Sequence, residues 1–295
     1  MKAFDIVTAS HIGGRSEQQD SVGKWTSNMT CLVVVADGVG GSTGGRAASQ
    51  EVIRCAAEYW KKCGEIMENP QQELTEIAHI ANDAIHALST GEKRSPASTI
   101  VALYMDQTHA HWVHCGDSRL YWLRPKKGEV STELARTRDH SVVQMLLEQN
   151  KITPEEMANH PDKGRILKAL GSRTFKGVDY SAHKYLAGDI FLLCSDGYWE
   201  SIATGYSILP PKPESMTPDA HINQLAHEAV KINGVDASDN TTLAIITSLD
   251  STEPESPARA NRQQASTPAK GQSSKRILMG MLYLFILLDL SLIHI

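Results

Sequence analysis

The sequence predicts a layered α+β domain, with antiparallel sheets inside and helices outside. Two helical patterns follow one another early in the chain, strand-like runs then occur in series, and strands return after further helices. The chain has 295 residues, of which 41% are hydrophobic and 21% charged, a balance typical of folded globular proteins. About 250 residues precede a change in composition. That length is enough for one large domain or two small ones, and we assign 1–250 to one catalytic domain.

In the first half, Cys31–Ala36 is a β-branched run that ends in Asp-Gly, as a buried strand entering a loop does. A helix is predicted over Gly45–Lys62. A second helix fits Gln72–Ser89, where apolar residues recur at helical spacing. Three strands separated by turn residues follow, at Ser98–Met105, Ala110–Cys115 and Arg119–Arg124.

In the second half, a helical stretch covers His140–Gln149. Another helix is predicted to begin at Thr153, because Thr is a good N-cap, Pro154 suits the first helical position and Glu156 closes a capping box. Two strands with a helix between them complete the pattern, at Asp189–Cys194, Asp219–Ile232 and Thr242–Ser248.

Charge and cysteine content narrow the class of protein. The formal net charge of −5 argues against a nucleic-acid partner, which usually needs a basic face. The five cysteines are odd in number and never spaced as C-x-x-C, so we expect buried free thiols in a reducing compartment. The N-terminus lacks the apolar core of a signal peptide, which predicts a cytoplasmic catalytic domain.

The composition changes at Asp250. Residues 251–275 contain no aliphatic residue larger than Ala and are expected to form a disordered linker. Residues 276–295 are interpreted as a C-terminal membrane anchor, because two basic residues precede twelve uninterrupted apolar residues, Ile277–Leu288. A span needs ~20 such residues, so an apolar remnant without a membrane role stays an alternative. Leu290–Ile295 is either natural or the in-frame product of a sequencing adapter, in which case the helix continues past Leu288.

Five short acidic signals carry the chemistry. Asp37 and Asp196 each follow a hydrophobic strand and precede glycine, which lets carbonyls and water come close. Carboxylates that converge without histidine or thiolate suit a hard cation, Mg²⁺ or Mn²⁺. Each signal alone is a common turn, but five in this order favour a metal site. They are Arg15-x-x-x-Gln19-Asp20, Asp37-Gly38, Gly116-Asp117-Ser118-Arg119, Ser195-Asp196-Gly197 and Asp239-Asn240.

On these residues the chain resembles the PPM family of metal-dependent protein serine/threonine phosphatases, in its bacterial form, over roughly residues 3–249. The resemblance implies a four-layer sandwich of two antiparallel β-sheets flanked by helices, with two Mn²⁺ or Mg²⁺ ions at one end. The stretches that carry it are VVADGVGG at 34–41, STIV at 98–101, HCGDSRLYWLR at 114–124, RDHS at 138–141, ILKALG at 166–171, DIFLLCSDGYWE at 189–200 and DNTTLAIIT at 239–247.

The resemblance also implies the ligands of the metals. Asp37 would bridge both ions, with the Gly38 carbonyl as a further ligand. Asp196 and Asp239 would hold one ion, and Asp20 would support the other through water.

A weaker third ion is implied at Asp117. Arg15 would hold the substrate phosphate through its planar fork of donors. No protein nucleophile is needed, because two cations lower the pKa of a bridging water, which then attacks phosphorus. Ser98 and Thr99 are expected to pack and hydrogen-bond near the centre instead of reacting.

Two positions depart from the family pattern. Gln19 stands where members commonly have Glu, and Ser42 stands where many bacterial members have His. The group that protonates the leaving oxygen therefore stays open. The segment from Asn150 to Lys163 corresponds to a variable flap and is expected to select the substrate. By analogy, we expect phosphorylated proteins as substrates, a cognate Ser/Thr kinase as partner, tethering to the inner membrane and a link to type VI secretion.

Three other interpretations compete with a phosphatase. Gly38-x-Gly40-x-x-x-Gly44 between a strand and a helix imitates a dinucleotide fingerprint, but a second helix follows where a parallel strand is required. A family member without activity, acting as a binding module, is disfavoured by the intact acidic set. A zinc site of His109, His111 and His114 is disfavoured, because on a strand 109 and 111 share a face while 114 points away, and no cysteine pair completes a ligand set.

Overall fold

A computed structural model describes residues 4–39, 44–89, 95–126, 129–157, 159–173, 175–203 and 207–249 of the chain. These residues belong to one compact unit, Met1–Ser251. The predicted linker, 251–275, and the predicted anchor, 276–295, lie outside the described residues. In the part of the chain that is described, no helix combines the length and the apolar character that crossing a membrane requires.

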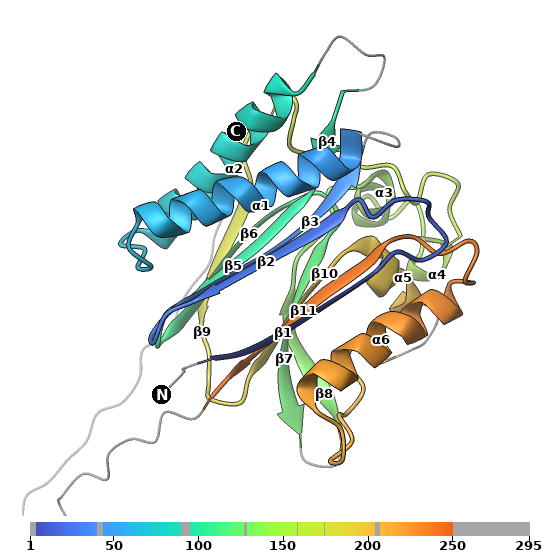
Figure 1. Cartoon of the computed structure of the whole chain (residues 1–295). Helices are drawn as coiled ribbons and strands as arrows, with labels where there is room; N and C mark the ends of the chain where they lie inside the picture. Colours follow the sequence, from blue (N-terminus) through green and yellow to red (C-terminus); the bar gives the residue numbers. More distant parts are fainter. Residues whose placement is uncertain are drawn as a thin grey trace, which may run out of the picture. The chain divides into compact units, whose positions relative to one another are not determined.

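Two antiparallel sheets form the centre of the unit (Figure 1). Sheet A has the strand order β1-β11-β10-β7-β8, and sheet B has the order β2-β3-β5-β6-β9, with β4 paired to β3. The strands of sheet A are β1 (Phe4–His11), β7 (Arg119–Lys126), β8 (Glu129–Arg136), β10 (Ile190–Cys194) and β11 (Thr241–Ser248). The strands of sheet B are β2 (Asp20–Thr26), β3 (Cys31–Val39), β4 (Ala97–Ser98), β5 (Ile100–Met105), β6 (His109–Cys115) and β9 (Asp179–Lys184).

Helices cover the outer face of each sheet, so the predicted four-layer sandwich is confirmed (Figure 1). The first two helices pack on sheet B and the last two on sheet A. The helices are α1 (Gly44–Lys62), α2 (Pro70–Ala87), α3 (Val142–Glu148), α4 (Pro154–Met157), α5 (Asp196–Ala203) and α6 (Pro218–Ile232). All strand pairs among the described residues are antiparallel, so the βαβ unit of a dinucleotide-binding fold is not formed there.

Strand β3 shows why a continuous apolar run was needed at this position. Leu32 and Val34 point toward α1 and α2, whereas Val33 and Val35 point toward sheet A, and all four side chains are fully buried. Burying a Val or Leu side chain contributes about 1.5–3 kcal/mol, so both faces of the strand stabilise the sandwich. The strand therefore holds its last residues, which include Asp37, in a fixed position.

Most predicted elements are present, with a few corrections. The predicted strand Ser98–Met105 is interrupted at Thr99, whose backbone turns to bond Asp37. The capping box at Thr153 is formed, since its N–H donates to Glu156 Oε2 at 2.8 Å, but α4 ends after one turn. Helix α5, which begins at Asp196, was not predicted. Four strands were not predicted, namely β1, β2, β8 and β9.

The cysteines are as predicted. All five are free, and four of them are buried, while Cys63 is half-buried.

Candidate metal centre

Five aspartates from both sheets converge at one end of the sandwich. Asp20 opens β2, Asp37 lies near the end of β3, and Asp117 follows β6. Asp196 is the first residue of α5, and Asp239 precedes β11. The negative charges of the other four all act on Asp37, which places the whole set within electrostatic reach of one another. The structure thus brings together all the acidic residues that the sequence predicted as ligands.

Asp20 and Asp37 are direct partners in the β2–β3 ladder. Gly38 follows, and its N–H donates to the Gln19 carbonyl at 3.2 Å. A Cβ atom at Gly38 would lie 2.0 Å from the carbonyl oxygen of Gly45, at the start of α1. Glycine is therefore required at position 38, because it lets α1 approach the strand end.

Neighbouring hydroxyls hold these two aspartates. Asp20 Oδ2 accepts a hydrogen bond from Ser195 Oγ at 2.7 Å, while its buried Oδ1 has no hydrogen-bond partner among the described residues. The N–H of Asp37 donates to Thr99 Oγ1 at 2.9 Å, and its carbonyl accepts from Ser98 Oγ at 3.1 Å. As predicted, Ser98 and Thr99 form hydrogen bonds near the centre, here with the backbone of Asp37. These two bonds fix the backbone of Asp37 and do not use its carboxylate oxygens.

Asp117 is fixed through its backbone. Its carbonyl accepts a hydrogen bond from Trp199 Nε1 at 2.9 Å. The preceding residue, Gly116, has a φ of +108°, and its N–H donates to His140 Nδ1 at 3.2 Å. The Asp117 side chain is 3% exposed, and its Oδ1 has no hydrogen-bond partner in the described part of the chain. A buried carboxylate oxygen of this kind is an available ligand.

The Trp199 ring packs against a buried ion pair. The Arg119 guanidinium lies 3.5 Å from the centre of the Trp199 ring. It also makes two hydrogen bonds to Asp139, at 2.7 and 2.6 Å. Arg119 thus joins Asp139 to the residue that positions Asp117.

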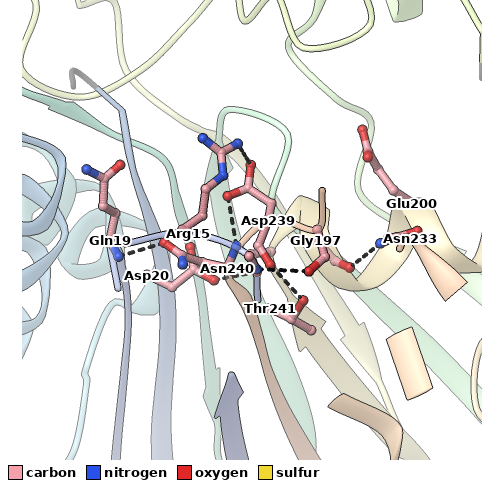
Figure 2. A network of polar contacts seen from close by, with 12 residues as sticks. Arg15, Gln19, Asp20, Gly197, Glu200, Asn233, Asp239, Asn240 and Thr241 are labelled. Atoms are coloured by element: carbon pink, nitrogen blue, oxygen red, sulfur yellow. Dashed lines mark hydrogen bonds and ion pairs between the residues drawn. The ribbon is translucent and has the colours of Figure 1, made fainter. Parts of the chain in front are cut away.

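Arg15 lies at the open edge of the site (Figure 2). Its Nη2 donates to Asp239 Oδ2 at 2.5 Å, and both side chains are partly exposed. Asn240 ties the surrounding loops together, because its Oδ1 accepts from the Gln19 N–H at 2.7 Å and its Nδ2 donates to the Ile12 carbonyl at 2.8 Å. The predicted phosphate-binding residue and a predicted metal ligand are therefore in direct contact.

Burial and mutual repulsion disfavour ionisation of the aspartates. The pKa of Asp37 is raised well above its usual range, first by burial and then by the charges of Asp196, Asp20, Asp117 and Asp239. Burial likewise raises the pKa of Asp196 well above its usual range. It raises the pKa of Asp20 to about 6 and that of Asp117 to about 7. Each shift reflects burial first, and then the negative charge of neighbouring carboxylates.

These features fit divalent cations. Uncompensated buried carboxylates are unfavourable unless they are protonated, paired or bound to metal. Two of them carry buried oxygens without a partner among the described residues, on Asp20 and Asp117. The donors are all oxygens, the type that Mg²⁺ and Mn²⁺ prefer.

The three histidines considered for a zinc site, His109, His111 and His114, do not gather around one point. His109 and His111 lie side by side on β6, with ring centres 5.9 Å apart, whereas His114 stacks on His140 at 4.7 Å. His114, His140 and Asp179 do come within a metal's reach of one another. The two rings are only 12° from parallel, however, and one ion cannot lie in the planes of two stacked imidazoles.

Several supporting residues were not assigned roles from the sequence. Ser195, Asp139 and Trp199 all occur in stretches that carry the resemblance, SDGYWE and RDHS, which was the available signal. Glu200 adds negative charge near Asp196 and pairs with Lys163 at 3.4 Å. Lys163 ends the predicted substrate-selecting segment, so this segment reaches the edge of the site.

Comparison with known proteins agrees with this geometry. The family model of protein phosphatase 2C matches residues 7–221. The serine/threonine phosphatase stp of Listeria innocua is 34% identical over 170 residues, which cover 56% of this chain and 66% of the relative. The match thus spans slightly less than two thirds of that relative's length.

Solved structures show the same fold. The Mycobacterium tuberculosis serine/threonine phosphatase PstP is 28% identical, with a TM-score of 0.64 over 84% of this chain and 99% of PstP. A structure of the PstP catalytic domain, at 27% identity, contains two manganese ions, with a TM-score of 0.64 and the same two coverages. PppA, described as a key regulatory component of the type VI secretion system in Pseudomonas aeruginosa, is 26% identical, with a TM-score of 0.63 over 84% of this chain and 99% of PppA.

Proposed function

The chain belongs to the protein phosphatase 2C family, and from this premise we propose that it hydrolyses phosphoserine and phosphothreonine on proteins, using Mn²⁺ or Mg²⁺. The observation that carries the proposal is the convergence of five aspartates at the end of the sandwich, two of them with buried oxygens that have no hydrogen-bond partner among the described residues. A phosphatase relative of the same fold contains two manganese ions, which supports this choice of cofactor.

Each predicted ligand has a place in this proposal. Asp37 would bridge two cations, with the Gly38 carbonyl beside it. Asp196 and Asp239 would hold one cation, and Asp20 the other. Asp117 would serve a weaker third site.

Phosphate binding and the attack on phosphorus also have candidate groups. Arg15 would bind and orient the phosphate, since its guanidinium is at the open edge and already contacts an anion. Two bound cations would activate water and stabilise the negative charge of an in-line displacement. The hydroxyls of Ser98 and Thr99 are occupied with the Asp37 backbone and with Ser118, so neither is placed to act as a nucleophile.

Metal chelation on a phosphothreonine peptide tests the proposal. The purified protein should release phosphate with Mn²⁺ or Mg²⁺, lose activity after exhaustive EDTA treatment and regain it when the metal is restored. Full activity in EDTA would exclude the metal mechanism. A protein that binds Mn²⁺ and the peptide but releases no phosphate would instead be a binding module.

The proposal also includes a cellular setting. Similarity to PppA is consistent with a role opposite a bacterial Ser/Thr kinase, in a pathway such as type VI secretion. The apolar run Ile277–Leu288 supports a tether that holds the catalytic domain on the cytoplasmic side of the inner membrane.

A further inference from the structure

A groove of about 690 Å³ lies on the sheet B side of the domain. One wall is the segment 166–173, and the other is formed by 95–97 together with the end of α2. A second hollow of about 560 Å³ lies along the same segment and is also lined by Lys176. We call the two hollows together the 166–176 groove, leaving aside Thr174, which is outside the described residues. No part of the proposed metal centre lines it.

One short strand, β4, lies between the groove and the metal centre. Ala97, in its wall, pairs with Val39, and the next residue, Ser98, pairs with Gly38. Ser98 also exchanges backbone hydrogen bonds with Leu170, at 3.2 and 2.8 Å. A polypeptide whose phosphorylated residue reaches Asp37 would therefore have neighbouring residues beside this groove.

The charge of the groove is opposite to that of the whole protein. Its described lining residues include three cations, Lys168, Arg173 and Lys176, and no Asp or Glu. All three cations are exposed. In a chain with a formal net charge of −5, such a lining provides a local attraction for anions.

Contacts inside the protein place these cations without neutralising them fully. The Arg173 Nε donates to His86 Nε2 at 3.0 Å, which orients the guanidinium at the groove without adding negative charge. Lys168 pairs with Asp179 at 3.3 Å, but both side chains are about half exposed. An exposed pair of this kind is weak and can exchange its carboxylate for another anion.

We propose that the 166–176 groove binds an acidic stretch of the phosphoprotein substrate, beside the phosphorylated residue. Carboxylates or a second phosphate on the same polypeptide supply the required charge. This inference rests on the proposed phosphatase function and adds a substrate class to it, namely phosphoproteins whose sites lie in acidic sequence.

Matched phosphothreonine peptides test the inference on the full chain. One set carries three Asp residues on either side of the phosphothreonine, and the other carries Asn at the same positions. The test variants are R173A/K176A and the charge reversal R173E/K176E. K231A is the matched control, because Lys231 is an exposed cation in the last turn of α6, on the other sheet. p-Nitrophenyl phosphate, which has no flanking residues, reports the basal activity.

The natural protein should prefer the Asp peptide, by roughly three- to tenfold in kcat/KM, mainly through KM. The preference should disappear in R173A/K176A and persist in K231A. On a third peptide set, with Lys at the same positions, R173E/K176E should prefer Lys over Asp. High salt should reduce the preference for Asp in the natural protein. Hydrolysis of p-nitrophenyl phosphate should be equal in all four proteins. Equal rates on Asp and Asn peptides in the natural protein, or a preference that survives charge reversal, would overturn the inference.

Binding measured without turnover separates this inference from the proposed function. Fluorescence anisotropy of the labelled peptides in EDTA should show tighter binding of the Asp peptide, lost in R173E/K176E. If the protein gives that result but hydrolyses neither peptide, the binding role of the groove stands and the phosphatase proposal is wrong. If hydrolysis is normal but both peptides bind equally, the binding role is wrong and the phosphatase proposal stands.

Discussion

Arg15 and Asp239 form an ion pair, with Nη2 2.5 Å from Oδ2. The Arg15 side chain is 58% exposed and that of Asp239 is 36% exposed, so water screens the pair and its contribution to stability is small. The contact matters more for placement. A phosphate held by Arg15 would lie directly beside a carboxylate that we assign to the metal.

Replacing Arg15 with Lys should raise KM for a phosphothreonine peptide more than it lowers kcat. Lysine keeps the charge but loses the planar fork that binds two phosphate oxygens. Arg54→Lys is the matched control, because Arg54 also forms exposed ion pairs, with Glu51 and Glu58, but lies on α1. Steady-state kinetics decides the matter, and an unchanged KM in the Arg15 variant would count against phosphate contact.

Replacing Asp37 with Asn should lower kcat by orders of magnitude at saturating Mn²⁺, because the shape stays while the charge that offsets two cations is lost. The fold should survive. The metal-free variant should even unfold at a higher temperature than the natural protein, since an amide neither ionises nor has to take up a proton in these buried, acidic surroundings. Calorimetry and p-nitrophenyl phosphate assays check both parts. Near-normal turnover would exclude the bridging role.

The contribution of Asp20 and Asp117 to the stability of the metal-free protein should fall as the pH rises from about 4 to about 7. Asp20 and Asp117 have folded-state pKa values of about 6 and about 7, raised from 3.8 first by burial. The unfolded chain loses these protons near pH 4, so between the two pH values the folded state binds more protons. Stability present at low pH is therefore lost as the pH rises through the folded pKa values.

Urea denaturation of the EDTA-treated protein at about pH 5 and about pH 7 measures this effect, which should amount to a few kcal/mol. Saturating Mn²⁺ should remove it, because the ions stabilise the ionised carboxylates. Several histidines have lowered pKa values and oppose this change, equally in the natural protein and in the Asp117→Asn variant, so the comparison of the two isolates Asp117. The natural protein should lose more stability, or gain less, than Asp117→Asn between the two pH values, and an equal change in both would contradict the prediction.

Replacing Arg119 with Met should destabilise the fold by about 3–5 kcal/mol, because Asp139 would remain buried without its partner. The two side chains are 8% and 2% exposed, and they are joined by two hydrogen bonds. The double variant Arg119→Met, Asp139→Asn should recover part of the loss. Urea denaturation compares the three proteins. A double variant no more stable than the single one would show that Arg119 acts through Trp199 instead.

The apolar run Ile277–Leu288 leads to a prediction about membrane association of the protein. If Ile277–Leu288 is part of a spanning helix, the protein should stay in the membrane fraction after a high-salt wash and be released by detergent. A variant that ends at residue 250 should be recovered in the soluble fraction with its phosphatase activity unchanged. Release of the complete protein by salt alone would exclude a spanning helix and leave the phosphatase proposal untouched.

The strands that were predictable from sequence are those buried on both faces. Cys31–Ala36 is a continuous apolar run, because β3 packs against helices on one side and sheet A on the other. Strand β9, Asp179–Lys184, has no fully buried side chain and reads as polar. Strand β2 is short of aliphatic residues because much of it is half-buried. Pairing with a neighbouring strand, which a local pattern does not encode, makes these segments into strands.

The aspartates of the site were predictable because each lies in a short motif, and these motifs carry the family resemblance. Their surroundings were less so. Trp199 reaches Asp117 from a helix that lies far away in sequence, and Ser195 reaches Asp20 across the two sheets. Contacts of this kind depend on how the sheets face one another, and single-sequence patterns carry no information about that.

Strand β1 pairs along its whole length with β11, from Phe4 with Ser248 to His11 with Thr241. Among the described strands, β1 is therefore synthesised first and β11 last, and within this set β11 is the one strand that pairs with β1 in sheet A. Contacts between residues so far apart in sequence slow folding. Until β11 is made, the edge of β1 stays unpaired, and an unpaired strand edge favours aggregation during synthesis. A nascent chain that stops before the eight residues of β11 should accumulate as insoluble material, since β10 also loses a neighbour.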